Sequence, residues 1–519
     1  SSPLVASNGA SLGVDVTGGF GAVPANVSLN NSTVTVAYGN LYGSSPYVTA
    51  LSDAGALTIN GTNNIVLTGT NLGLGIYTII SYGSIDGSGS FNPNPILPLG
   101  VFGRVETNGN AIVVNITSQV QQLTWSGMTG LDWTTANNWN YGSATYMDYG
   151  PYGDVVTFDD TLDGTALNTN VNMSVAVQPF AMTVNNNTYD YSFGGSGKIT
   201  GLASLIKKGV AALTLNTAND FDGGSSLQSG MVRLGNDAGL GSGTIALAGG
   251  GISSAGGTPR TVTNAMSITA ASALGDSNQP GQLTFAGPVD LNGSAEDIAV
   301  SSDVVFSGTY TNGSFREKSG SGNLIFTGTG YQGGTLEIGE GNIVVDGGVI
   351  SGGSVRISCQ PPNDIARLIV TNGGSVTVTS GNARIGSGPE FPGDPSSTNE
   401  LDLSGTIDIA GSAQIGANSA FDQVNMHPDS VFKLQGFSYM GTAVVEVNVN
   451  KGTFVAKTNK SAFFPPHMTV NIQASGLTMD SAGFVVGIPV GLSDGGGSGG
   501  LTKTGAGALE LNGTNAYTG

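Results

Sequence analysis

The chain has 519 residues, of which 84 are glycine, 10% are charged and 39% are hydrophobic. Glycine is about twice as frequent as in an ordinary globular domain, and charged residues are less than about half as frequent. These values argue against a charged disordered tail, a collagen with glycine at every third position and a membrane helix of about 18 apolar residues. A chain rich in Gly, Asn, Ser, Thr and Val but poor in helix formers is expected to be all-β.

The charge excludes several kinds of partner. The formal net charge is −19, and residues 1–197 contain a single cation, Arg104. A surface of this sign repels phosphate groups and anionic lipid headgroups, so we expect no nucleic-acid partner and no direct membrane insertion. The one cysteine, Cys359, permits no internal disulfide and is expected to be a buried small apolar residue. The scarcity of lysine and cysteine favours a secreted or cell-surface location.

Along the chain, the first distinctive segment comes after residue 120. It contains all three tryptophans, Trp125, Trp133 and Trp139, with several tyrosines beside them. If these rings are exposed, they could stack on sugars and bind cell-surface glycans. If they are buried, they would form a packing cluster at a change of coil. Both interpretations remain open at this point.

The same segment contains the densest group of carboxylates. Calcium binds six to eight oxygen atoms of such loops, which makes Asp154, Asp159 and Asp160 calcium candidates, although no known calcium-binding repeat is present and solvated loops are the alternative. Adjacent strand residues point to opposite faces, so Asp159 and Asp160 are not expected to act together as acid and base. With no convergent site elsewhere, we expect no enzyme, no catalytic residue and no cofactor-binding residue.

Beyond residue 200 one pattern recurs. Residues 205–223 align without a gap with residues 501–519, and a looser copy begins at Lys318. Each copy has a lysine, a glycine two residues later, and a Leu-x-Leu or similar pair whose two side chains lie on one face of a strand. Gly and Asn then mark a turn. Short strands between such turns describe the coils of a β-solenoid, in which each coil buries its apolar face against its neighbours.

The repeated Lys-x-Gly-x-Gly-x-Leu-x-Leu-x-Gly-x-Asn-x-Tyr-x-Gly pattern resembles the autotransporter-associated β-strand repeat of large secreted bacterial passenger proteins. The segment that contains Trp125, Trp133 and Trp139 is similar to the aromatic segment that opens many modules of these proteins. Residues 75–82 look like the closing segment of a preceding module. The resemblance implies an elongated, right-handed parallel β-helix at the cell surface, and it implies almost nothing about activity.

The resemblance also suggests a division of the chain. Residues 1–120 are expected to close one β-solenoid module, and residues 121–200 to form the aromatic-rich opening segment of the next. Residues 201–519 are expected to form a β-helix with repeats at about 205–235, 318–348 and 501–519. Irregular loop insertions are expected at three proline-containing places, namely Pro361–Pro362, Pro389–Pro395 and Pro465–Pro466.

The two ends of the chain suggest self-association. Gly519 falls within the repeat, and residues 1–13 loosely match the segment that comes after the equivalent Gly223. An uncapped solenoid end exposes unpaired backbone groups. We therefore expect head-to-tail joining, either as tandem copies in one polypeptide or as separate subunits; alternatively, the chain boundaries coincide with a repeat seam. The residues expected at this joint are Ser1, Leu4, Val5, Leu12, Val14, Leu509, Leu511, Asn515, Tyr517 and Gly519.

These features support two hypotheses about function. The first is a non-enzymatic, self-associating extracellular fibre or surface-array subunit, a homopolymer whose partner is a second copy of the chain. The alternative is a surface adhesin whose β-helical stalk presents the Trp and Tyr side chains to glycans.

Overall fold

The structure is a computed structural model. It describes residues 2–41, 46, 48–149, 153–162, 167–293, 295–359, 365–386 and 396–519, without the side chains of residues 53, 54, 317 and 332. Ser1, which was expected at the joint, and the expected loop insertions at Pro361–Pro362 and Pro389–Pro395 lie outside the described residues.

The fold confirms the expected class. The chain is all-β and forms a parallel β-solenoid of about 21 turns. Contacts divide it into two compact units, which are described separately: unit 1 comprises Ser1–Leu123 and Met147–Val155, and unit 2 comprises Thr124–Tyr146 and Val156–Gly519. The described residues contain no helical segment with the length and hydrophobicity that a bilayer crossing requires.

In its described residues, unit 1 contains two sheets around one apolar core. Its strands are parallel except that β10 pairs antiparallel with both β7 and β9. Among the described residues, the first sheet has the order β1 (Leu4–Ser7), β3 (Val27–Asn30), β5 (Leu51–Asn60), β7 (Gly75–Asp86), β10 (Ala111–Gln119), β9 (Val101–Thr107). The second has the order β2 (Ser11–Asp15), β4 (Thr33–Asn40), β6 (Thr62–Thr70), β8 (Ser90–Phe91).

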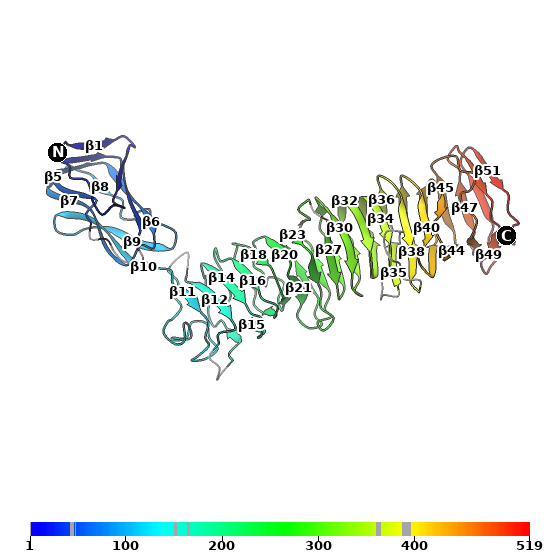
Figure 1. The fold of residues 1–519 in the computed structure, drawn as a ribbon, viewed down its shortest axis with the longest axis horizontal. Helices are drawn as coiled ribbons and strands as arrows, with labels where there is room; N and C mark the ends of the chain where they lie inside the picture. Colours follow the sequence, from blue (N-terminus) through cyan, green and yellow to red (C-terminus); the bar gives the residue numbers. More distant parts are fainter. Residues whose placement is uncertain are drawn as a thin grey trace. The chain divides into compact units, whose positions relative to one another are not determined.

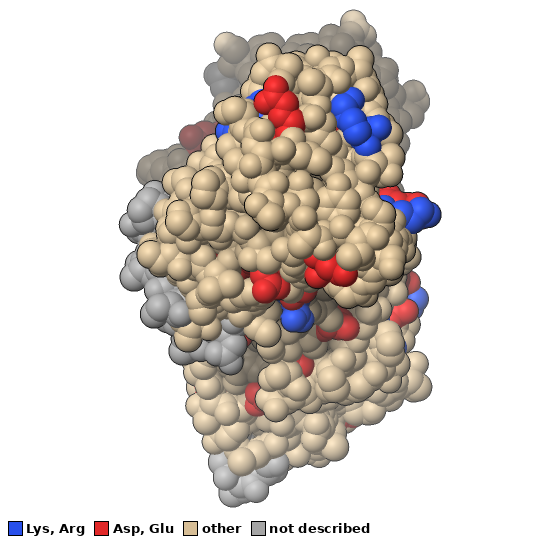
Figure 2. All heavy atoms as spheres, turned by 90° about the vertical axis from the view of Figure 1, so that its right-hand side faces the viewer, with Lys and Arg blue, Asp and Glu red and all other residues tan. Residues whose placement is uncertain are grey.

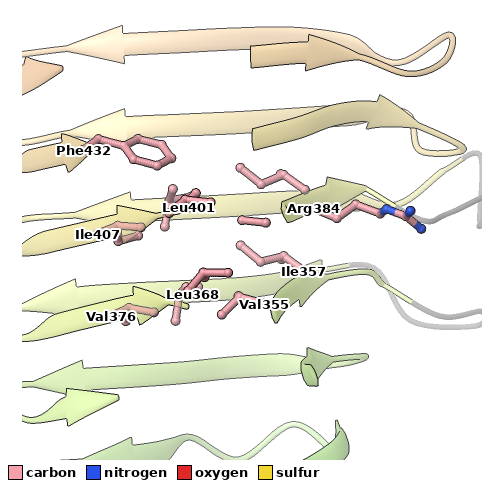
Figure 3. Close-up of a pocket in the computed structure, with 12 residues that line it drawn as sticks. Val355, Ile357, Leu368, Val376, Arg384, Leu401, Ile407 and Phe432 are labelled. Atoms are coloured by element: carbon pink, nitrogen blue, oxygen red, sulfur yellow. The ribbon is translucent and has the colours of Figure 1, made fainter. Parts of the chain in front are cut away.

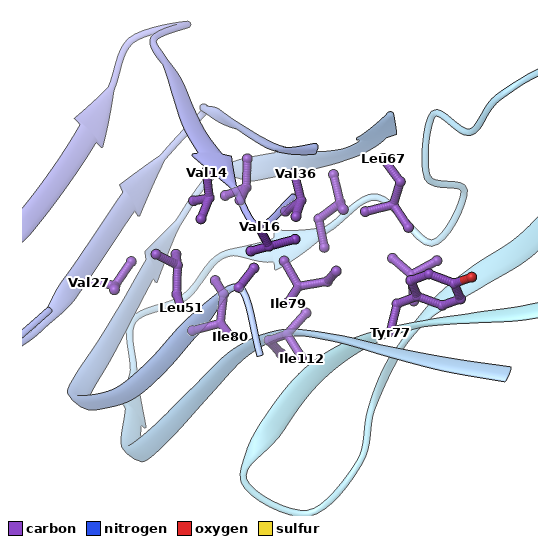
Figure 4. Close-up of a cluster of buried hydrophobic side chains, with 14 of the residues drawn as sticks. Val14, Val16, Val27, Val36, Leu51, Leu67, Tyr77, Ile79, Ile80 and Ile112 are labelled. Carbon is purple, nitrogen blue, oxygen red and sulfur yellow. The ribbon is translucent and has the colours of Figure 1, made fainter. Parts of the chain in front are cut away.

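The core of unit 1 follows from the alternation of residues along its strands. In β4 every second residue is buried, because successive side chains of a strand point to opposite faces. Val36 of β4, Leu67 of β6 and Ile79 of β7 meet in the interior, and each is at most 1% exposed (Figure 4).

The largest sheet has 28 strands in the described part of the chain and continues through the successive coils of unit 2 (Figure 1). Its strands, in order, are β11 (Gln122–Thr124), β12 (Val155–Asp159), β13 (Asn170–Asn172), β14 (Ala181–Asn185), β15 (Tyr191–Gly194), β16 (Leu205–Lys208), β17 (Leu213–Leu215), β18 (Ser225–Leu227), β19 (Met231–Leu234), β20 (Ile245–Ala248), β21 (Gly251–Ser254), β23 (Met266–Ala270), β24 (Ser272–Leu274), β26 (Val289–Asp290), β27 (Ala295–Val300), β29 (Tyr310–Thr311), β30 (Ser314–Ser319), β32 (Thr329–Ile338), β34 (Val349–Ile357), β36 (Ser375–Val378), β37 (Ala383–Gly386), β39 (Thr406–Ile409), β40 (Ala413–Ala417), β42 (Val431–Leu434), β43 (Phe437–Tyr439), β45 (Gly452–Ala456), β47 (Leu477–Asp480) and β50 (Leu501–Thr504).

Two further sheets complete the described part of unit 2. One contains 11 strands, namely β22 (Arg260–Val262), β25 (Leu283–Phe285), β28 (Val304–Phe306), β31 (Leu324–Phe326), β33 (Gly341–Asp346), β35 (Ile365–Thr371), β38 (Thr398–Leu403), β41 (Phe421–Met426), β44 (Val444–Val449), β46 (Met468–Ile472) and β49 (Leu492–Asp494). The other is the pair β48 (Val485–Ile488) and β51 (Ala508–Leu511).

Each regular coil of unit 2 has three strands, as β41, β42 and β43 illustrate. Equivalent positions of neighbouring coils are in register, so Val424, Val447 and Val470 lie above one another. All three are fully buried, with 0% exposure. Such stacked apolar side chains form the core, because a single coil has no second layer of its own to pack against.

Candidate functional site

The three tryptophans come together in the first coils of unit 2. The ring centroids of Trp125 and Trp139 lie 5.1 Å apart in an edge-to-face pair, and the ring of Trp133 lies 5.1 Å from that of Phe158. All three tryptophans are 0% exposed. A ring without exposed surface cannot stack on a sugar. The suggested glycan contact through Trp125, Trp133 and Trp139 is therefore corrected to the packing interpretation.

The polar atoms of this cluster support the same role. The indole Nε1 of Trp125 donates a hydrogen bond to the main-chain oxygen of Asn168 at 2.8 Å, and that of Trp139 donates to the oxygen of Trp133 at 2.9 Å. The first bond ties the irregular segment between residues 124 and 146 to the chain just before β13, and the second holds that segment together internally. The cluster thus organises the start of unit 2.

The three calcium candidates each accept hydrogen bonds from main-chain N–H groups. The carboxylate of Asp154 is fully buried and accepts hydrogen bonds from the main-chain N–H groups of Gln121 and Met147, at 2.7 and 3.0 Å. Burial raises the pKa of Asp154 above its usual value, and these two hydrogen bonds oppose that rise. The carboxylate of Asp159 accepts from the N–H group of Thr161.

Asp160 has the most extensive set of donors. Its carboxylate accepts from the main-chain N–H groups of three consecutive residues, 187 to 189, at 2.7 to 3.2 Å. Partial burial would raise the pKa of Asp160, but these donors lower it overall. No group of three or more His, Cys, Asp or Glu side chains among the described residues could hold a metal ion. Calcium binding by Asp154, Asp159 and Asp160 stays a prediction.

The lysines of the repeat connect neighbouring coils. Lys207 is fully buried, and its Nζ donates to the main-chain oxygens of Lys208 and Gly209, at 2.6 and 2.7 Å, and of Ser229 at 3.3 Å. Ser229 belongs to the next coil, since β16 and β18 are paired strands. An ammonium group has three donors and no acceptor, so it matches three carbonyl oxygens at this corner.

The second copy repeats this arrangement. Lys318 is also fully buried, and its Nζ donates to the oxygens of Gly320 and Glu340, the latter at 2.7 Å. Burial lowers the pKa of both Lys207 and Lys318 to about 8. The glycine two residues after the lysine has a positive φ, 73° at Gly209 and 80° at Gly320. That conformation directs the carbonyl groups toward the ammonium and favours glycine.

The repeated asparagine has the same connecting role. The side-chain oxygen of Asn219 accepts from the N–H group of Ile199 at 2.9 Å, and its nitrogen donates to the oxygen of Gly239 at 2.7 Å. These two partners lie one coil before and one coil after Asn219. In the last copy the side-chain oxygen of Asn515 likewise accepts from the N–H group of Leu492 at 3.0 Å.

Six of the residues expected at a head-to-tail joint lie on strands at the edges of their sheets. Leu4 and Val5 belong to β1, Leu12 and Val14 to β2, and Leu509 and Leu511 to β51, while Tyr517 and Gly519 come after β51. Val5 is 70% exposed and Leu511 is 39% exposed, whereas Val14 is buried in the core of unit 1. Whether the two ends associate stays a prediction.

Sequence reasoning aligned Lys207, Lys318 and Lys503 but assigned them no role. The signal was available, because a lysine that recurs at the same position of all three copies indicates a charge with a fixed partner. The partners are main-chain oxygens of the same corner and of the next coil. They could not be located until the coils were in register.

The fold is a parallel β-solenoid, and hydrogen bonds from the Lys and Asn side chains of its repeats join neighbouring coils. Over 190 residues the chain is 30% identical to "Adhesin BmaC autotransporter" of Brucella suis biovar 1 (strain 1330). This similarity covers 36% of the chain and 5% of that protein, so the chain corresponds to a small part of this curated relative. No family model matches, and the resemblance to the repeat family is therefore not confirmed in that way. No solved structure matches either.

Proposed function

We propose that the chain is a β-solenoid part of a non-enzymatic bacterial surface adhesin of the autotransporter passenger type. The observation that carries the proposal is the similarity over 190 residues to a protein named as an autotransporter adhesin. The fold is consistent with it. The 11-stranded sheet of unit 2 corresponds to about 50 Å of stacked coils, since neighbouring strands are about 4.8 Å apart, and such a stack can carry a binding surface away from a cell.

The side chains of the first coils support a structural role. The aromatic cluster is buried, and the carboxylates of Asp154 and Asp160 accept hydrogen bonds from main-chain N–H groups. These groups therefore stabilise the solenoid. In a hydrolase, acidic and aromatic side chains of this kind would have to face a substrate. Binding would then occur on the outward faces of the strands, where the side chains between the buried positions lie.

Bead attachment tests this proposal. Beads coated with the 519-residue chain would be applied to epithelial monolayers and to surfaces coated with neutral or acidic polysaccharides, with serum-albumin beads as the control. The proposal expects attachment well above the control on at least one of these surfaces. Attachment equal to the control on all of them would overturn it.

We propose end-to-end association as a second function, on a separate observation. Lys503 donates to the oxygens of Thr504 and Gly505, at 2.8 and 2.7 Å, and Lys207 makes the same two contacts plus a third to the following coil. Among the described residues, the outer edges of β50 and β51 have no strand partner. A further coil, from the same polypeptide or from another copy, would supply the third acceptor.

Lys503 also provides the test of this second function. Sedimentation and electron microscopy of the purified chain would detect filaments, and K503M should shorten them because it removes the cation at the joint. K208M changes an exposed lysine of the first copy and is the matched control. Monomeric wild-type protein at all concentrations would refute association between separate copies.

A further inference from the structure

A groove lies along the turns that follow three strands of the first coils of unit 2. The strands are β13, β15 and β17, which pair in register in successive coils. The groove is lined by residues 174–176, 195–198 and 216–218, and its volume is about 400 Å³. Sites for small molecules commonly have about 300–1,000 Å³. Since neighbouring strands are about 4.8 Å apart, three coils give the groove a length of about 10 Å.

The groove exists because of the turns at this corner. Later coils have a strand of the 11-stranded sheet at this place, as β25 between β24 and β26 shows, whereas the first coils have turns of small residues. A Cβ atom at Gly195 or Gly197 would overlap main-chain atoms of the preceding turn. Glycine therefore allows these turns to lie directly on one another, and no large side chain fills the space beside them.

Two exposed polar side chains in the groove are held in place by hydrogen bonds. Ser196 Oγ donates to the main-chain oxygen of Ser174 at 3.1 Å, and its lone pairs can accept from a ligand. Asn216 Nδ2 donates to Ser192 Oγ of β15 at 2.9 Å, so the groove adjoins the outward face of the strands. This bond uses one amide N–H of Asn216, and the amide also has a second N–H and an oxygen. The groove therefore provides both donors and acceptors.

The charged side chain in the groove already has a partner. Lys198 pairs with Asp220, which lies one coil further along the chain. An anionic ligand would have to compete with Asp220 for this ammonium group, and the net charge of −19 would repel it. The face in Figure 2 shows how few charges the chain presents, since its charged side chains are scattered among uncharged ones. A ligand of this groove should therefore be uncharged.

We propose that this groove binds an uncharged sugar unit of a glycan. The inference rests on the proposed adhesin function and specifies its ligand class. Sugar hydroxyls donate and accept hydrogen bonds, as Ser196 and Asn216 require, and sugar C–H groups can contact the exposed methyl groups of Val175 and Ala218. An extended polypeptide fits less well, because the groove offers only such small side chains to its apolar groups.

The test uses three uncharged polysaccharides, namely dextran, mannan and galactan. Polygalacturonate is the charged comparison, and β-casein is the unfolded polypeptide. Binding of the full chain to each immobilised polymer would be measured by biolayer interferometry at low and at physiological salt. At least one uncharged polysaccharide should bind, with an affinity that changes little with salt. Failure of all three to bind would overturn the proposal, and binding of polygalacturonate or β-casein in their place would assign the surface to another partner.

Two variants locate the binding in the groove. A218W places a large side chain in the groove and should abolish binding, while A271W places the same side chain at an exposed alanine between β23 and β24 and is the matched control. N216A should weaken binding about two- to tenfold, because it removes a hydrogen-bonding group. Circular dichroism melting would confirm that the variants fold. Equal binding by A218W and A271W, or unchanged binding by N216A, overturns the proposal.

Bead attachment separates this inference from the function on which it rests. Beads that attach to cells equally well with and without A218W would leave the adhesin proposal standing and reject the groove as its ligand site. Binding of an uncharged polysaccharide that A218W abolishes, without attachment of beads to any surface, would support the groove and reject the adhesin.

Discussion

The ammonium group of Lys207 donates a hydrogen bond to the main-chain oxygen of Ser229, which lies 3.3 Å away in the next coil. Lys318 makes the equivalent bond to Glu340 at 2.7 Å. The separation in sequence is 22 residues in both cases. The lysine of the repeat is therefore a link between coils, and this link explains why two of the repeat copies contain a buried charge.

The first prediction concerns this link. K207M should lower the free energy of unfolding by about 1–3 kcal/mol, because it leaves buried carbonyl oxygens without a donor. Urea denaturation followed by circular dichroism would measure the loss. K208M is the matched control, since Lys208 is adjacent but exposed. If the two variants are equally stable, the hydrogen bonds of Lys207 contribute nothing to the free energy of unfolding.

The second prediction is a dependence of stability on pH. Burial lowers the pKa of Lys207 and Lys318 from 10.5 to about 8. Between these values the unfolded chain binds more protons than the folded chain, so the free energy of unfolding should rise as the pH increases from 8 toward 10. Below pH 8 both lysines are charged in both states and their contribution is constant.

Denaturation at several pH values would measure this slope. Burial raises the pKa of Tyr77 to about 12. Its titration therefore lowers the free energy of unfolding as the pH increases, but only above pH 10. The double variant K207M/K318M should lose the rise between pH 8 and 10. A slope that persists in this variant would assign the effect to other groups.

The third prediction concerns a small apolar void of about 20 Å³ in the core, which Val376 and its neighbours line (Figure 3). V376I should add a methylene group to this space and raise the stability by about 0.8 kcal/mol. V424I adds the same group in the stacked core away from the void, where overpacking should cost about 1–3 kcal/mol. Thermal melting of both variants would show whether their effects have opposite signs, as expected.

The fourth prediction separates packing from recognition in the aromatic cluster. W133A should destabilise the start of unit 2 by about 3–5 kcal/mol, because it removes a fully buried aromatic side chain. Y141A removes a ring that is 59% exposed and should change stability by less than about 0.5 kcal/mol. Hydrogen exchange of residues 124–160 would localise the effect. Stability of W133A equal to that of Y141A would contradict the packing role.

Several features were predictable from the sequence. The Leu-x-Leu alternation at Leu213 and Leu215 predicts a strand with one buried face, and the recurrence of this unit predicts stacked coils. Both are observed, since Leu213 and Leu215 are at most 1% exposed and pair in register with Val232 and Leu234. The burial of Cys359 was also predicted, and it is 0% exposed.

Other features depend on contacts that no local pattern encodes. A tryptophan on a surface and a tryptophan in a core look the same in a sequence. The burial of Trp133 could therefore be recognised only once the position of Phe158 beside it was known. Arg356 and Arg384 are 28 residues apart, and they lie opposite each other because of the register in which β34 and β37 pair. The antiparallel pairing of β10 with β7 depends on long-range contacts in the same way, whereas its pairing with β9 is a local hairpin whose turn contains Asn108 and Gly109.

The attachment of coated beads tests the central claim, a surface adhesin built on this solenoid, most directly. Beads that carry the 519-residue chain should attach to at least one of the cell or polysaccharide surfaces well above serum-albumin beads. Fab fragments raised against unit 2 should block this attachment. Attachment no higher than that of the albumin beads on every surface would contradict the account.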